Sequence, residues 1–200
     1  MKKITIAIIA IIILGIVGFA TYKLIKKEDP TPTQTDAQKF ASEYTEIDED
    51  NIFVYRKSEE IIKILENGSG VVYIGFKECK WCQQYITYLH DVATSVGLEK
   101  IFYLDILEER ENNSENYQRI VEILKDYLEF DSEGNPRIYV PEIIVLEKGE
   151  IIGHDNETAY DTKGYSDPKE YWNEDRVTKL KTKLKTMMLE ISDNSCSECN

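Results

Sequence analysis

The sequence predicts a layered α/β domain built on a central mixed β-sheet, preceded by an apolar segment. Helical periodicity separates the first four strand-like segments, which favours parallel strands with helices on both faces of the sheet. Residues 71–76 are almost continuously apolar, as expected of a central strand that is covered on both sides. A hairpin turn at Lys148-Gly149 adds antiparallel strands near the end of the domain.

The predicted elements follow the order β-α-β-α-β-α-β-β-α. Turns between them are marked by Gly, Pro, Asn and Asp. We expect strands at residues 51–56, 71–76, 101–106, 142–146 and 150–153. We expect helices at residues 58–66, 79–96, 117–130 and 167–191, with polar loops at residues 107–116 and 154–166.

The most specific motif is Cys79-Lys80-Trp81-Cys82, a C-x-x-C at the junction of the central strand and the next helix. A helix N-terminus stabilises a thiolate, because unpaired N–H groups and the positive end of the helix dipole converge there. The second cysteine lies three residues further on the same helix face, so the two can close a small disulfide ring. This arrangement is typical of a thiol–disulfide redox site.

Charge excludes some classes of partner. The formal net charge is -13, although residues 1–27 carry five lysines and no acidic side chain. The rest of the chain holds 19 basic and 37 acidic side chains, which argues against binding to nucleic acid or to an anionic membrane surface. Four cysteines in two C-x-x-C pairs are too few for a disulfide scaffold of this length and suit redox or metal chemistry better.

Three stretches carry a resemblance to a known family: FKECKWC at residues 76–82, VPEIIV at residues 140–145 and KGE at residues 148–150. With this element order, residues 48–191 resemble the thioredoxin family, and in particular membrane-tethered bacterial thioredoxin-like proteins that accompany bacteriocin export. The resemblance implies a thioredoxin-like fold. It also implies that Pro141 is cis and faces the cysteine pair, and that Val140 hydrogen-bonds the substrate backbone.

The chain departs from the family pattern in two respects. The sequence Trp-Cys-Gly-Pro-Cys of thioredoxin is replaced here by Glu-Cys-Lys-Trp-Cys, beginning at Glu78. Residues between the cysteines tune the redox potential in this family, so the direction of the reaction (reduction, oxidation or isomerisation) stays open. Thioredoxin carries a buried Asp six residues before its first cysteine, and Tyr73 occupies that position here. We expect Tyr73 to be a core residue.

The residues of the motif suggest separate roles in a disulfide exchange. Cys79 is the expected nucleophile, and the more buried Cys82 is expected to resolve the mixed disulfide. Lys80 and Trp81 border the site, and Trp81 is expected to cover one side of it and to contact substrate. His90 and His154 have no evident partner and are expected to be structural. The reaction requires no cofactor and no metal.

A second pair, Cys196 and Cys199, lies in the C-terminal tail. It could exchange electrons with the first pair or close a local disulfide without a catalytic role. Together the two pairs could also form a Cys₄ zinc site, although they are separated by far more residues than in a zinc ribbon.

The N-terminal part carries a membrane segment. Residues 4–22 are uncharged and mostly apolar, with lysines on both sides, and are long enough to span a bilayer. A cleavable signal peptide ending near Ala20 is the alternative, but the apolar run is longer than a usual signal core. We therefore divide the chain into an anchor or uncleaved signal at 1–27, a linker with a short helix capped by Asp36 at 28–47, the thioredoxin-like domain at 48–193, and a cysteine-containing tail at 194–200.

The function predicted from the sequence is a membrane-tethered thiol–disulfide oxidoreductase whose domain lies outside the cytoplasm. Its expected partners are protein thiols or disulfides and a membrane electron-transfer protein that recharges the cysteine pair. Two alternatives stay open: a thioredoxin-like accessory protein of an export complex with little redox turnover, and a zinc-stabilised structural domain. Secretion after signal cleavage is the alternative to a retained anchor.

Overall fold

The structure is a computed structural model that describes residues 34–156 and 164–196, with residues 192–196 described by their backbone only. The chain divides into two units, Met1–Gln34 and Thr35–Asn200, and the second unit contains the sheet and its helices. The apolar run at residues 4–22 lies outside the described residues. None of the helices that are described is long and apolar enough to cross a membrane.

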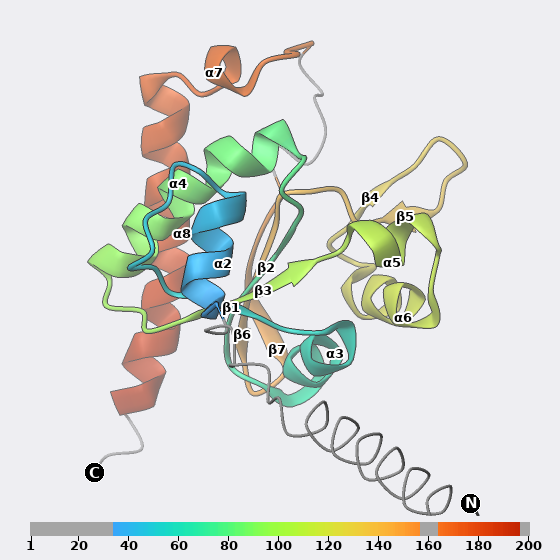
Figure 1. The fold of residues 1–200 in the computed structure, drawn as a ribbon. Coiled ribbons are helices and arrows are strands. Elements are labelled where there is room, and N and C mark those ends of the chain that lie inside the picture. Colours follow the sequence, from blue (N-terminus) through green and yellow to red (C-terminus); the bar gives the residue numbers. More distant parts are fainter. Residues whose placement is uncertain (1–33, 157–163, 197–200) are drawn as a thin grey trace, which may run out of the picture. The chain divides into compact units, whose positions relative to one another are not determined.

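Five strands form the central sheet: β1 (Phe53–Tyr55), β2 (Gly70–Gly75), β3 (Ile101–Asp105), β6 (Glu142–Glu147) and β7 (Glu150–Asp155). Their order across the sheet is β1-β3-β2-β6-β7 (Figure 1). β1 and β2 each pair in parallel with β3, whereas β6 pairs antiparallel with both β2 and β7. The predicted mixed sheet flanked by helices is thereby confirmed.

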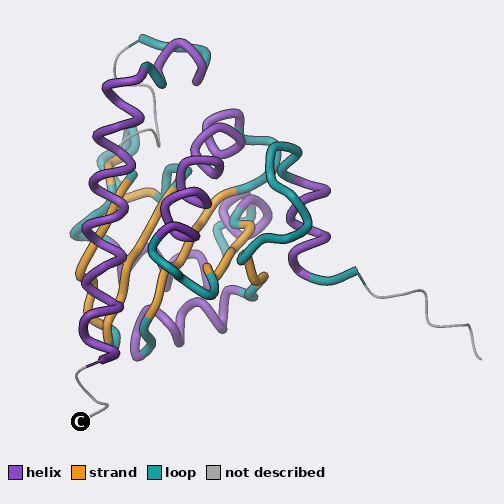
Figure 2. The backbone as a smooth tube through the Cα atoms, turned by 90° about the vertical axis from the view of Figure 1, so that its left-hand side faces the viewer, coloured by secondary structure: helices purple, strands orange, loops and turns teal. Residues whose placement is uncertain are grey.

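Helices cover both faces of this sheet. They are α2 (Asp36–Glu43), α3 (Ser58–Asn67), α4 (Lys80–Ser95), α5 (Leu107–Glu111), α6 (Glu115–Leu124), α7 (Pro168–Tyr171) and α8 (Glu174–Cys196). α4 and α8 pack side by side on one face, and α3 packs with α6 on the other (Figure 1). Figure 2 shows α8 running alongside the strands, where it contacts β6 and β7.

β2 is the central strand because its side chains are apolar on both faces. Five of its six residues are buried, and it pairs with β3 on one side and β6 on the other. Alternate side chains of a strand point to opposite faces, so Tyr73 and Gly75 lie on the same face. That face is the one covered by α4, since Gly75 lies beside the sulfur of Cys82.

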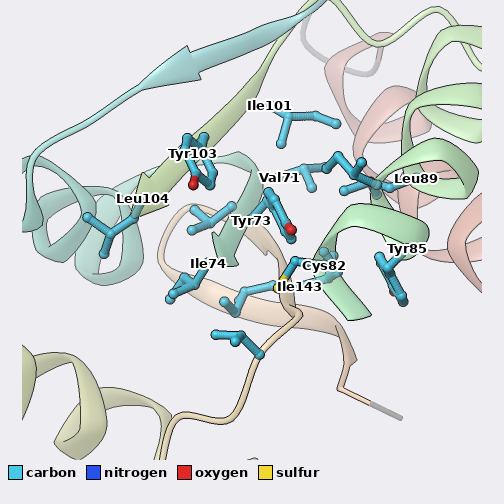
Figure 3. Close-up of a cluster of buried hydrophobic side chains, with 14 of the residues drawn as sticks. Val71, Tyr73, Ile74, Cys82, Tyr85, Leu89, Ile101, Tyr103, Leu104 and Ile143 are labelled. Atoms are coloured by element: carbon cyan, nitrogen blue, oxygen red, sulfur yellow. The ribbon is translucent and has the colours of Figure 1, made fainter. Parts of the chain in front are cut away.

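An aromatic cluster fills the space between α2 and the sheet. The ring centroid of Phe40 lies 4.0 Å from that of Phe53 and 4.4 Å from that of Tyr44. Tyr73 on β2 stacks on Tyr103 on β3 with their centroids 5.4 Å apart (Figure 3). All five side chains are at most 1% exposed. α2 therefore belongs to the same core as the sheet, and its N-cap is Thr35 rather than the expected Asp36.

The segment between β3 and β6 differs from its prediction. The expected loop at 107–116 contains α5, and α6 ends at Leu124, short of the predicted residue 130. Ser114 separates the two helices because its hydroxyl accepts the Tyr117 N–H and caps α6. Residues beyond α6 form a small hairpin instead, in which β4 (Glu129–Phe130) pairs with β5 (Pro136–Arg137).

The C-terminal helix also differs. Asp167 caps a helix with Pro168 at its first position, as predicted, but this helix, α7, ends after one turn. Trp172 leaves the helical conformation, which buries its ring against Tyr85 and Tyr88. The side chain of Asn173 then accepts the Arg176 N–H, so that α8 starts anew. α8 continues to Cys196 and includes part of the expected tail.

The aromatic cluster predicts a large difference between two phenylalanines. Phe40→Ala should lower the free energy of unfolding by about 3–5 kcal/mol, because it removes a fully buried ring from a closely packed layer. Phe130, which is 63% exposed, provides the matched control, and Phe130→Ala should change stability by about 0.5 kcal/mol or less. Urea denaturation followed by circular dichroism measures both. Similar losses in the two variants would contradict the packing of α2 against the sheet.

Candidate active site

The C-x-x-C sequence lies where β2 ends and α4 begins. In the intervening turn, the N–H of Cys79 donates to the carbonyl oxygen of Phe76 at 3.2 Å. Cys79 is the N-cap of α4, and its sulfur accepts the N–H of Cys82 at 3.1 Å. The sulfur thus does what a side-chain oxygen does in most helix caps. The structure places Cys79 at the helix N-terminus and Cys82 in the first turn, as the sequence predicted.

The two thiols lie in different environments. Both are free; Cys79 is partly exposed and Cys82 is fully buried. The pKa of Cys79 lies below its ordinary value, chiefly because the Cys82 thiol donates a hydrogen bond to the Cys79 sulfur. Backbone N–H groups that point at this sulfur lower the pKa further, whereas burial acts in the opposite direction and raises it. Burial raises the pKa of Cys82 well above its ordinary value. Deprotonation of the pair therefore starts at the accessible sulfur.

The loop before β6 closes the other side of Cys79. The peptide bond between Val140 and Pro141 is cis, as the family resemblance implied. Both residues are buried, and the carbonyl oxygen of Val140 lies 3.9 Å from the sulfur of Cys79. The structure thus brings together four of the predicted site residues, Cys79, Cys82, Val140 and Pro141.

Lys80 and Trp81 occupy different positions at this site. Lys80 is exposed and lines an open groove beside α4, together with Glu43, Lys77, Gln83, Asp167 and Lys169. Trp81 is partly buried, and its ring packs edge-on against Tyr171 of α7, with centroids 5.4 Å apart. Trp81 therefore ties the start of α4 to α7, a contact that the sequence did not predict.

Arg110 is a site residue that the sequence did not reveal. It lies on α5, within the stretch expected to be a loop, and its guanidinium stands 4.9 Å from the ring centroid of Phe76 in the turn before Cys79. Its positive charge contributes to the lowered pKa of Cys79. The run Leu-Glu-Glu-Arg-Glu consists of good helix formers, which is the signal that could have revealed α5.

Glu142, the residue after Pro141, is a buried acid. Its side chain is fully buried at the start of β6, and one of its oxygens pairs with Nε2 of His154 on β7. Burial raises the pKa of Glu142 to about 7, although the hydrogen bond and charge of His154 oppose the shift. His154 thus has a partner, which the sequence did not reveal. The ring of His90 lies 6.0 Å from that of Phe53, centroid to centroid.

The tail pair falls largely outside the described residues. Cys196 is the last residue of α8 and is described by its backbone only, whereas Cys199 lies beyond the described part of the chain. Among the side chains that are described, no group of three or more His, Cys, Asp or Glu is placed to hold a metal ion.

Comparison of the chain with protein-family models, with curated proteins and with solved structures finds no match. The site itself consists of a partly exposed thiol that caps a helix and a buried thiol in the first turn of that helix.

The position of Arg110 predicts a change in thiol reactivity. Arg110→Gln should raise the pKa of Cys79 by less than about one unit, because a nearby positive charge that favours the thiolate is lost. The rate of iodoacetamide alkylation as a function of pH measures this pKa, with Cys196 and Cys199 replaced by Ser. Arg119→Gln, which removes an arginine paired with Glu66, is the control and should leave the profile unchanged. An unchanged or lowered pKa in Arg110→Gln would contradict the prediction.

The buried Glu142 predicts a pH-dependent stability. Its pKa is raised on folding, so its contribution favours the native state below about pH 4.5 and is lost as the pH rises through about 7. The loss should reach about 3 kcal/mol in the free energy of unfolding. Urea denaturation between pH 5 and about 8 should show this decline in the unchanged chain and not in Glu142→Gln.

Glu129→Gln, at an exposed position of β4, is the matched control and should keep the decline. If the stability of the unchanged chain instead rises with pH relative to Glu142→Gln over this range, the predicted direction of the pH dependence is wrong.

Proposed function

We propose that this protein is a thiol–disulfide oxidoreductase with a thioredoxin-like fold. The observation that carries the proposal is that the two thiols at the start of α4 differ in exposure and in pKa. Cys79 is partly exposed with a lowered pKa, and Cys82 is buried with a raised pKa. An exposed thiolate with a protonated partner on the same helical turn is the arrangement that a stepwise disulfide exchange requires.

The arrangement of the sheet supports the thioredoxin-like part of the proposal. The C-x-x-C follows the central strand, and the cis Val140–Pro141 bond precedes a β6–β7 hairpin at the edge of the sheet. Two segments that are far apart in the sequence therefore meet at Cys79. This is the placement that the resemblance of residues 76–82 and 140–150 to thioredoxins implies.

The proposed reaction proceeds in two displacements. The Cys79 thiolate attacks a substrate disulfide; a bond forms between Cys79 and one substrate sulfur, and the other sulfur leaves as a thiolate with the electron pair. Cys82 then loses its proton to solvent and attacks Cys79, forming the Cys79–Cys82 disulfide and releasing the second substrate thiolate with the electron pair of the broken bond. The substrate gains two electrons from the cysteine pair, and an external dithiol returns them. Run in reverse, the same steps oxidise a protein dithiol.

The cellular setting is proposed from the sequence. The apolar run at residues 4–22 would tether the domain to the cell membrane, with the domain outside the cytoplasm, where disulfides of exported proteins form and persist. Protein thiols and disulfides are the proposed substrates, and a membrane electron carrier is the proposed source of reducing or oxidising equivalents.

The proposal predicts which cysteine variant traps its substrate. Cys82→Ser should accumulate a mixed disulfide with a protein substrate, because the resolving thiol is lost and the nucleophile stays. Cys79→Ser should trap at least about tenfold less, since the remaining thiol is buried and protonated. Non-reducing gel electrophoresis after acid quenching measures the trapped species, with Cys196 and Cys199 replaced by Ser throughout.

Reduced and alkylated substrate protein, which carries no disulfide, is the control and should give no adduct with either variant. Equal trapping by both variants would contradict the assigned roles. Absence of any adduct, together with no reduction of insulin disulfides by the unsubstituted pair, would favour the alternative of an accessory protein without redox turnover.

A further inference from the structure

The hydroxyl of Tyr73 is a buried polar group without a hydrogen-bond partner in good geometry among the residues that the structure describes. Tyr73 is fully buried on β2, beneath the start of α4. Leaving a hydroxyl unpaired in the protein interior is destabilising, so such a group calls for an explanation. The neighbouring hydroxyls of Tyr44 and Tyr103 pair with each other at 3.0 Å and do not share this deficit.

The Tyr73 hydroxyl lies close to the sulfur of Cys82, and it also lies near the hydroxyl of Tyr44. A Cβ atom added to Gly75 would lie 2.6 Å from the oxygen of Tyr73 and 3.4 Å from the sulfur of Cys82, so these two atoms border the same small space. Figure 3 shows the oxygen of Tyr73 on the side of its ring that faces Cys82. The absence of a side chain at Gly75 is what leaves room for the phenol to reach the thiol.

The phenol can stabilise a Cys82 thiolate as a hydrogen-bond donor, but it cannot serve as the base that takes the proton of the thiol. Burial raises the pKa of Tyr73 well above its ordinary value, and a negative charge on Cys82 would raise it further. The hydroxyl therefore stays protonated and cannot accept the proton of the thiol. A neutral O–H can instead donate to a sulfur that carries negative charge, and Tyr73 accordingly opposes the raised pKa of Cys82 that burial causes.

We propose that Tyr73 is the hydrogen-bond donor that stabilises the Cys82 thiolate in the second displacement of the exchange. This inference rests on the proposed function and assigns a further residue to it. In the dithiol state the hydroxyl is held near the sulfur without a bond of good geometry. When Cys82 loses its proton to solvent, the O–H of Tyr73 turns onto the new thiolate while that sulfur attacks Cys79. The bonds that form and break are those of the proposed reaction, and Tyr73 keeps its proton throughout.

The groups around Cys82 determine which ionisations can appear in the pH dependence of the second displacement. The described charged or titratable groups that interact with Cys82 are Cys79 at the N-cap of its own helix, Tyr73 on β2, Tyr44 at the C-cap of α2, Tyr103 on β3 and Arg110 on α5. The pKa values of all three tyrosines are raised by burial, so the phenols stay neutral across the working range. Ionisation of the two thiols is then what the profile records.

The test separates the two displacements in one reaction. The reduced full-length chain, with Cys196 and Cys199 replaced by Ser, is mixed with a slight excess of the aromatic disulfide 5,5′-dithiobis(2-nitrobenzoate). Attack by Cys79 releases the first equivalent of coloured thiolate, and attack by Cys82 on the mixed disulfide releases the second. Stopped-flow absorbance over a range of pH values gives the rate and the pH profile of each phase.

Tyr73→Phe should leave the first phase unchanged and slow the second about three- to tenfold. Loss of a hydrogen bond to the Cys82 thiolate should reduce the fraction of Cys82 that is ionised by about tenfold or more. The rate falls by less than this fraction, because a more basic thiolate is also a stronger nucleophile. The profile of the second phase should move to higher pH by about one unit. Tyr103→Phe is the matched control, because it removes a buried hydroxyl from the same layer and should leave both phases near wild type.

The outcomes separate this inference from the function on which it rests. Two normal phases in Tyr73→Phe, or equal slowing in Tyr73→Phe and Tyr103→Phe, would overturn the role of Tyr73 and leave the oxidoreductase standing. A wild-type chain that releases only one equivalent would overturn both. Near-ultraviolet circular dichroism and an unchanged first phase establish that the substituted chain is folded, and slowing of both phases by the same factor would count against a specific role.

Discussion

The hydrogen bond from the Cys82 N–H to the sulfur of Cys79 is the interaction on which the site depends. It forms because Cys79 caps α4, and α4 starts there because β2 ends at Gly75 and the chain must turn. β2 is fixed in turn by burial on both faces between β3 and β6. Packing of the central strand thus determines where the first thiol meets a set of unpaired N–H groups, and those groups favour its charged form.

Burial gives the two cysteines of the site different surroundings. Cys79 is near solvent, near Arg110 and near the carbonyl oxygen of Val140, whereas Cys82 lies behind it against the sheet. In an interior of low polarizability a negative charge is costly unless donors face it, so the first negative charge goes to the sulfur with the most donors. Glu142 follows the same rule at the far side of the cis bond, where burial keeps its carboxyl protonated to a higher pH than usual.

Much of the fold followed from periodicity, and the exceptions have physical causes. The apolar run of β2, the capped cysteine and the Asp167-Pro168 helix start are local signals that packing reinforces. The break at Trp172 was not visible, because it is set by a ring that is buried against α4, a contact between distant segments. Arg110 was missed for a related reason: its importance lies in its distance to Phe76 and Cys79, which no spacing along the chain encodes.

Tyr73 is a second residue whose environment the sequence predicted only in part. The sequence identified it correctly as a core residue, but its apolar ring and its polar tip have different surroundings: the ring stacks on Tyr103, and the hydroxyl lies beside Cys82. A buried carboxylate at this position would place a second negative charge close to Cys79 and raise the free energy of its thiolate. A phenol supplies a donor without a charge. In the proposed exchange, the first thiolate then forms without a second negative charge beside it, and the second is stabilised once Cys79 is bonded to substrate and its charge is gone.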